Sequence, residues 1–295
     1  MFYCDHHKTS AEVDKKTIKI LKFVFVINFL LTVLEIFFGY IAKSTALIGD
    51  GLHNLGDSLS IMLLIIAFIM GSRIANKKYS YGFKRSEVLG SLINLFILFL
   101  SAIYLLFEGF SKMFNPSQID GELVMVVAFI ALVVNACTAF LLFKNAKSNT
   151  GIKIIFIHNF SDVIVSLSVI LSGMFALMLG WYFVDSVIAI MMAGYLLIQV
   201  VSNLPGIFNI LMNASPDNLS IDDIKSKIME VKGVVDVHHI HLWSISEKEI
   251  GFDCHVVSEN LDILLEIKKI LKEDYNIFHS NIQIEKCSCE EEGVF

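Results

Sequence analysis

The chain has 295 residues, of which 55% are hydrophobic and only 18% are charged. Because soluble domains usually carry about 25% charged residues, this composition excludes an ordinary soluble protein and predicts a membrane protein with a more polar part attached. The net charge of −6 argues against nucleic acid as a partner, and the odd number of cysteines, five, does not make a disulfide framework.

Six apolar segments are long enough to cross about 30 Å of hydrocarbon as helices, in which backbone groups bond internally. They lie at 20–42, 46–71, 87–113, 122–145, 153–179 and 182–203. We therefore expect a transmembrane domain of six helices over residues 20–204. The arm that precedes it, residues 1–19, lacks the apolar core and cleavage site of a signal peptide.

Lysine and arginine are concentrated in the N-terminal arm and in the loops after the second and fourth segments. The loops on the opposite side offer only Lys43 and Lys112. By the positive-inside rule, this asymmetry predicts a multi-pass membrane protein with both termini in the cytoplasm.

The composition changes after Asn203. Residues 205–219 contain Pro, Gly, Asn and Ser and are interpreted as a linker. Over residues 220–295, a helix capped by Ser220 is followed by two β-branched strands, a second helix and a short last strand. The order α-β-β-α-β predicts a small cytoplasmic α+β domain of the ferredoxin-like type.

Two of the predicted spans carry the same pattern, His-x-x-x-Asp. The second span has His53 and Asp57 in HNLGD, and the fifth has His158 and Asp162 in HNFSD. Residues four apart lie one above the other on a helix, so each span presents an imidazole and a carboxylate in one direction. If the two faces meet, they supply a tetrahedral ligand set for Zn²⁺, and the two carboxylates neutralise its charge.

Other readings of these polar residues remain open. A single intramembrane His or Asp can simply bond to a neighbouring helix, although two identical pairs favour a metal site. Asp50, one turn before His53, is either a helper carboxylate near the mouth of the site or an interfacial residue, and Asp185 is expected to face the interface. An intramembrane metalloenzyme is disfavoured, because four ligands leave no open coordination position and no His-Glu-x-x-His motif occurs.

Histidines and cysteines also gather outside the predicted spans. In a regular strand, His239 and His241 share one face while His238 points to the other. The two ends of the chain carry thiol and imidazole groups, which are good zinc ligands. These are Cys4, His6, His7, Cys287 and Cys289. The alternatives are a polar surface with packed histidines and disordered tails with incidental thiols.

The combination of two His-x-x-x-Asp spans, six segments and an α-β-β-α-β domain resembles the cation diffusion facilitator family of zinc transporters. The resemblance covers nearly the whole chain and is carried by STALIGDGLHNLGDS, YSYGFKRSEVLGSLIN, HNFSD and LMNASPDNLSIDDIKSKIMEVKGVVDVHHIHLWSI. The last stretch is similar to the bacterial zinc, cobalt and cadmium efflux branch.

The resemblance implies a homodimer, in a bacterial plasma (inner) membrane, that exchanges Zn²⁺ for protons by alternating access in zinc homeostasis. It assigns the transport site to His53, Asp57, His158 and Asp162. It also implies a regulatory zinc site at or near His238, His255, His279 and Glu285, and in some zinc transporters the terminal Cys/His motifs of neighbouring subunits join. The rival functions are transport of Co²⁺, Cd²⁺, Fe²⁺ or Mn²⁺ and, more remotely, a membrane metal sensor; two histidines argue against Fe²⁺ and Mn²⁺.

Overall fold

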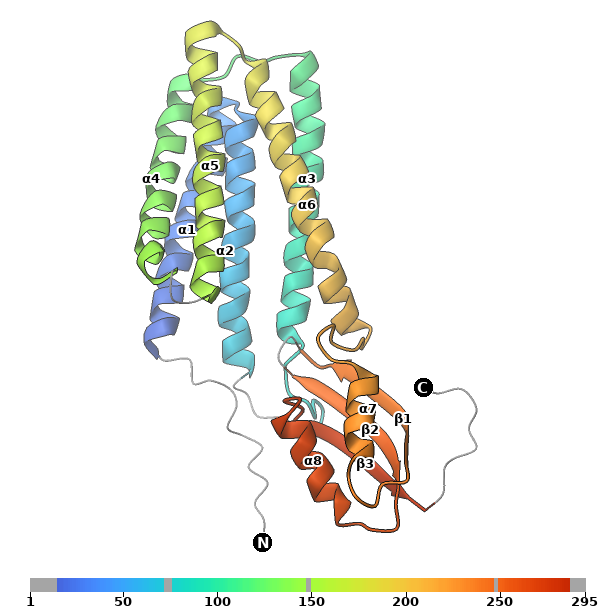
Figure 1. Cartoon of the computed structure of the whole chain (residues 1–295). Coiled ribbons are helices and arrows are strands. Elements are labelled where there is room, and N and C mark those ends of the chain that lie inside the picture. The colour runs from blue at the N-terminus through green and yellow to red at the C-terminus, as the bar shows by residue number, and fades with distance from the viewer. Residues whose placement is uncertain (1–14, 72–75, 147–149, 247–248, 287–295) are drawn as a thin grey trace. The chain divides into compact units, whose positions relative to one another are not determined.

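The computed structural model describes residues 15–71, 76–146, 150–246 and 249–286 (Figure 1). The chain divides into two compact units. One contains the described parts of Val13–Ile66 and Gly90–Leu204, and the other contains those of Ala67–Leu89 and Pro205–Phe295. The turn before the third helix therefore belongs to the same unit as the C-terminal domain.

The first unit is built from long helices that run alongside one another (Figure 1). Their bounds are α1 Lys15–Ala42, α2 Thr45–Gly71, α3 Ser86–Phe114, α4 Gly121–Ala146, α5 Thr150–Leu179 and α6 Phe183–Leu211. Within the described residues, four helical segments are long and apolar enough to cross a membrane. They are Lys22–Ala42, Ser86–Phe114, Ser161–Leu179 and Phe183–Leu211. The crossing of the membrane by 46–71 and 122–145 stays a prediction.

Small residues let these helices approach closely. A Cβ added to Gly173 of α5 would lie 2.8 Å from the carbonyl oxygen of Gly121 of α4, and one added to Gly109 of α3 would lie 2.8 Å from Ile190 of α6. Close contact through glycine is typical of helices packed in lipid. Large apolar side chains such as Phe107 remain exposed on the outside of the helices, as a lipid-facing surface requires.

The predicted linker needs a correction at its start, because α6 continues to Leu211. Pro205 lies inside this helix, where it removes one backbone donor, but the apolar residues after it continue the helical hydrogen bonds. The helix ends instead at Asn213, whose φ of 57° is a left-handed conformation that terminates helices. Residues 205–211 are therefore helical.

The C-terminal domain has the predicted order α-β-β-α-β. Its elements are α7 Ile221–Met229, β1 Asp236–Ser244, β2 Ile250–Val257, α8 Ile263–Glu273 and β3 His279–Glu285. The strands lie in the order β1-β2-β3, with β1 antiparallel to β2 and β2 parallel to β3. Ser220 caps α7 by accepting a hydrogen bond from the backbone N–H of Asp223 at 3.3 Å, as predicted.

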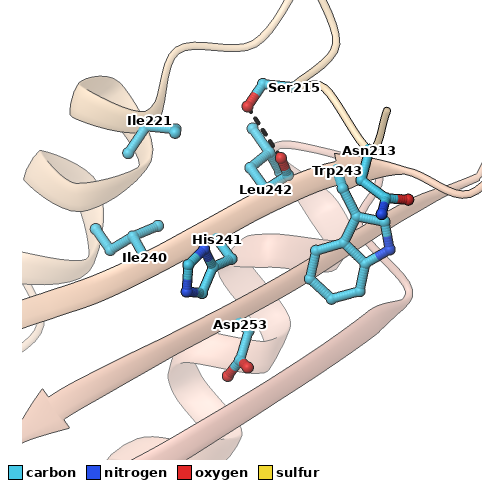
Figure 2. A pocket seen from close by; sticks show the side chains of 8 residues that line it. All are labelled: Asn213, Ser215, Ile221, Ile240, His241, Leu242, Trp243 and Asp253. Carbon is cyan, nitrogen blue, oxygen red and sulfur yellow. Dashed lines mark hydrogen bonds between the residues drawn. The ribbon is translucent and has the colours of Figure 1, made fainter. Parts of the chain in front are cut away.

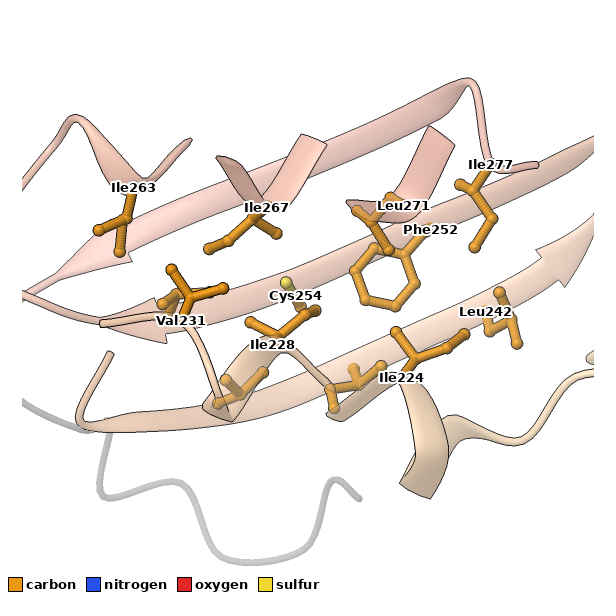
Figure 3. Close-up of a cluster of buried hydrophobic side chains, with 13 residues drawn as sticks. Ile224, Ile228, Val231, Leu242, Phe252, Cys254, Ile263, Ile267, Leu271 and Ile277 are labelled. Carbon is orange, nitrogen blue, oxygen red and sulfur yellow. The ribbon is translucent and has the colours of Figure 1, made fainter. Parts of the chain in front are cut away.

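One face of this sheet forms the core of the domain (Figure 3). Ile263, Ile267 and Leu271 recur every four residues on α8 and are buried against Phe252 and Cys254 of β2. Burial raises the pKa of the Cys254 thiol to about 12, so this cysteine stays protonated and packs as an apolar residue. The opposite face of the sheet is left to carry the histidines.

Candidate metal centres

The helices α2 and α5 bring three predicted transport ligands together. His53 Nε2 lies 3.1 Å from Asp162 Oδ1 and 3.7 Å from Asp57 Oδ2. The three ligand atoms lie within 4.8 Å of one another. The i, i+4 spacing on α2 aligns His53 with Asp57, and the packing of α5 against α2 supplies Asp162.

This group is buried inside the helical unit, but unevenly. The side chain of His53 is 2% exposed, whereas that of Asp57 is 23% exposed. The ring of Tyr195 on α6 meets the imidazole of His53 edge to face, with centroids 5.5 Å apart. The imidazole of His53 is thus contacted by α5 and α6 as well as by its own helix, α2. Asp57 has the most solvent-accessible side chain of the three ligands.

The fourth predicted ligand, His158, belongs to α5, one turn before Asp162. Its side chain lies outside the described residues, so its place in the ligand set stays a prediction. The terminal residues Cys4, His6, His7, Cys287 and Cys289 also lie outside the described part of the chain.

Two further carboxylates border this group: Asp50, which the sequence offered as a helper carboxylate, and Glu35, which the sequence alone did not link to the site. Asp50 is fully buried between the helices and accepts a hydrogen bond from Ser166 Oγ at 3.1 Å. Glu35 of α1 is also fully buried and accepts one from Asn54 Nδ2 at 2.8 Å. Within the described residues, Asp50 Oδ1 and Glu35 Oε1 have no hydrogen-bond partner. The signal that could have grouped them is their shared occurrence as carboxylates inside apolar spans.

The sequence predicts that Asp185 faces the membrane interface, and this prediction is wrong. Asp185 lies in the first turn of α6 and is buried against the start of α2. Its carboxylate accepts hydrogen bonds from the backbone N–H groups of Thr45 at 2.7 Å and Ala46 at 3.2 Å. The hydroxyls of Ser44 and Ser172 donate to the same carboxylate. Free N–H groups at a helix N-terminus attract a carboxylate, and here they draw Asp185 inward. It joins α2, α5 and α6 at one end.

A second group lies on the exposed face of the C-terminal sheet. Glu285 Oε2 lies 3.4 Å from His238 Nε2, and its Oε1 lies 3.0 Å from His255 Nδ1. The strand register explains this meeting, because His238 pairs with His255 and Glu285 pairs with the nearby Val257. One ligand atom from each of the three residues lies within 4.8 Å of the other two.

His279 is not part of this group, although we expected it there. It pairs with Gly251 at the start of β2, which is four residues, or about 13 Å, before His255 along the strand. Its Nε2 lies 3.9 Å from Glu249 Oε2, and its ring packs against that of Tyr81 with centroids 5.8 Å apart. His279 and Glu285 lie at opposite ends of β3, and the parallel register pairs them with opposite ends of β2.

The three histidines of β1 also depart from the predicted alternation. His238 pairs with His255 and His241 pairs with Asp253, so two β1 residues lie opposite Cys254. Such a bulge shifts the alternation by one residue. As a result, His239 joins the other two on the exposed face, and its ring stacks on that of His255 with centroids 4.7 Å apart.

Comparison with known proteins agrees with these features. The model of the cation efflux transmembrane domain matches residues 21–212, and that of the cation efflux protein, cytoplasmic domain, matches residues 216–287. The chain is 29% identical over 262 residues to the metal cation efflux system protein CzcD of Cupriavidus metallidurans, with 87% of this chain and 83% of that protein covered. It is 28% identical over 287 residues to the cadmium, cobalt and zinc/H(+)-K(+) antiporter of Bacillus subtilis, with coverage of 95% and 91%.

Among solved structures, the metal-bound C-terminal domain of the CzcD transporter aligns with 23% of this chain and 99% of that domain, at 25% identity and a TM-score of 0.22. The two family models together span both units of the chain, and the first alone matches more than half of it. The chain belongs to the cation diffusion facilitator family of metal cation efflux transporters.

Proposed function

We propose that this protein is a Zn²⁺/H⁺ antiporter that removes zinc from the cytoplasm by alternating access. The observation that carries the proposal is the buried group of His53, Asp57 and Asp162, in which one imidazole lies between two carboxylates. Nitrogen and carboxylate ligands in a tetrahedral set are typical of zinc, and His158 is the expected fourth ligand. The two negative charges neutralise the ion where hydrocarbon would otherwise exclude it.

The exchange follows from competition for the same lone pairs. Zinc requires a neutral imidazole and ionised carboxylates, so its binding releases protons from these ligands. In the inward-facing state, cytoplasmic Zn²⁺ enters past Asp57, the most exposed of the three. After the helices reorient, protons from outside displace the ion, and their return to the cytoplasm drives the next cycle.

The proposed transporter is a multi-pass membrane protein with a cytoplasmic domain. Six helices cross the inner membrane of a bacterium, both termini lie in the cytoplasm, and two chains form a homodimer. The domains are an arm at 1–19, a membrane domain at 20–204, a connection at 205–219 with a helical first half, and the cytoplasmic domain at 220–295. His238, His255 and Glu285 bind regulatory Zn²⁺ there, and the terminal cysteines and histidines remain candidates for a further site.

Transport of Co²⁺ or Cd²⁺ is the second candidate function. It is favoured by the names of relatives such as the Bacillus subtilis antiporter of cadmium, cobalt and zinc. The ligand types do not separate these ions from zinc, because imidazole and carboxylate accept all of them.

Zinc flux in proteoliposomes tests the transport site. Asp57→Ala and Asp162→Ala each remove one of the charges that hold the ion, so uptake driven by a pH gradient should fall at least about tenfold. Glu122→Gln is the matched control, since it removes an exposed carboxylate from the first turn of α4 and should leave the flux unchanged. Near-normal flux in Asp57→Ala would remove this group from the mechanism, and parallel runs with Co²⁺ and Cd²⁺ rank the metals.

A further inference from the structure

The backbone of β1 adopts a disfavoured conformation at the bulge described above. His239 has a φ of 51°, in the left-handed region that residues with a Cβ seldom adopt. Such a conformation persists only where the surroundings impose it, and it is common at functional sites. Its effect here is to bring a second imidazole next to that of His241.

The two imidazoles are spaced as ligands of one ion. His239 Nε2 and His241 Nε2 lie 3.3 Å apart, and the rings are almost perpendicular, at 87°. Zinc binds imidazole nitrogen at about 2.0–2.1 Å, so two nitrogens on a tetrahedral ion stand about 3.3–3.4 Å apart. Little movement is then needed for both nitrogens to accept the same ion.

The neighbouring strand, β2, carries a carboxylate across from His241. Asp253 is the cross-strand partner of His241, and facing side chains on neighbouring strands stand about 4.5–5.5 Å apart at Cβ. Figure 2 shows both side chains lining one open cavity of about 440 Å³. One oxygen of Asp253 accepts a hydrogen bond from Asn281 Nδ2 at 3.2 Å, which holds the carboxylate in place.

This pair is separate from the group around Glu285. The rings of His239 and His255 stack with planes 25° apart. Imidazole lone pairs lie in the plane of the ring, so stacked rings direct their nitrogens along two different layers. An ion bound by His238, His255 and Glu285 therefore lies in one layer, and an ion bound by His239 lies in the other.

We propose that His239 and His241, completed by water and with the negative charge of Asp253 on the neighbouring strand, form a second cation site on the C-terminal domain, for a dication of the zinc, cobalt or nickel type. Two imidazole nitrogens suit these borderline metals better than Mg²⁺ or Ca²⁺. The site goes beyond the proposed function, because it requires neither transport nor occupancy of the Glu285 group.

Equilibrium dialysis of the full-length protein in detergent against Zn²⁺ tests the proposal. The double variant His239→Gln/His241→Gln should bind one ion fewer per chain than the parent. His238→Gln/His255→Gln should also bind one fewer, and the combination of all four changes should bind two fewer. Asp253→Asn should retain the ion but weaken its binding at least about tenfold. His279→Gln is the matched control, because it removes an imidazole from the same sheet but from neither group.

Two results would overturn the second site. One is an unchanged zinc count in His239→Gln/His241→Gln, which would leave the pair as a hydrogen bond between two rings. The other is the loss of only one ion when all four residues are changed, which would show a single shared site. A fold control comes from His239→Gly, since glycine accepts the left-handed φ. This variant should melt no lower than the parent without metal, yet gain less from added Zn²⁺.

Discussion

At the scale of single residues, the carboxylates of Glu35 and Asp50 are the least expected feature of the helical unit. Each is fully buried, and within the described residues each uses only one oxygen as a hydrogen-bond acceptor. Leaving a carboxylate oxygen without a partner in an apolar environment is costly. Attraction to a cation in the His53 group therefore explains the burial of these two carboxylates better than helix packing alone.

Neutral isosteres of Asp50 and Glu35 should distinguish attraction of a cation from a role in helix packing. Asp50→Asn retains an acceptor for Ser166 but removes a charge near the His53 group, so zinc should bind about tenfold more weakly. Glu35→Gln retains an acceptor for Asn54 and should have a smaller effect in the same direction. Competition with a chromophoric chelator measures both, and unchanged affinities in both variants would assign these residues to packing.

At the scale of secondary-structure elements, Asp185 shows how one side chain fixes the end of a helix. It binds two backbone N–H groups at the start of α2 and the hydroxyls of Ser44 and Ser172. The cap thus fixes the start of the helix that also carries His53 and Asp57, about two and about three turns further on.

Removal of the cap should destabilise the helices more than it weakens the site. Asp185→Asn removes a charge–dipole interaction and at least one acceptor, for a loss of about 1–2 kcal/mol, while Ser172→Ala should cost less. Thermal unfolding in detergent would show a lower midpoint, with zinc affinity of the folded protein preserved. If stability is unchanged but zinc binding is lost, Asp185 acts as a ligand and not as a cap.

The elements themselves were largely predictable, whereas their irregularities were not. The apolar runs gave the long helices, and the i, i+4 rule gave the alignment of His53 with Asp57. The bulge in β1 departs from the strict alternation that the sequence pattern predicts for a regular strand. Yet the buried residues Val237, Ile240 and Leu242 are spaced by three and then two, which no regular strand allows. His279 was misplaced because the register of a parallel strand is not written in its own sequence.

At the scale of the whole molecule, the boundary between the two compact units does not follow the boundary between membrane and polar sequence. The turn before α3 belongs with the C-terminal domain, where Lys84 pairs with Glu249 and Arg85 Nη2 donates to Asn213 Oδ1. Glu249 also faces His279, so one carboxylate links this turn to two strands of the sheet. If Zn²⁺ binds to the sheet as proposed, Glu249 is the contact through which that binding would reach the turn before α3.

Reversal of this ion pair tests that route. Both side chains are partly exposed, so Glu249→Lys should change the free energy of unfolding by no more than about 1 kcal/mol. It should nevertheless weaken the dependence of transport on cytoplasmic Zn²⁺, and Lys84→Glu in the same chain should restore it. The measurement is the initial rate of zinc flux across a zinc titration. A curve that Glu249→Lys leaves unchanged would assign the pair to the surface alone.

The register of β1 has one more consequence. If the chain passed directly from His238 to Ile240, the residues Val237, His238, Ile240, His241 and Leu242 would alternate inward and outward with every present partner on β2 retained. The hydrophobic core would be complete and no backbone would be forced into a left-handed turn. Folding of the sheet therefore does not require a residue at position 239, and the imidazole of His239 can serve a chemical role without any cost to the core.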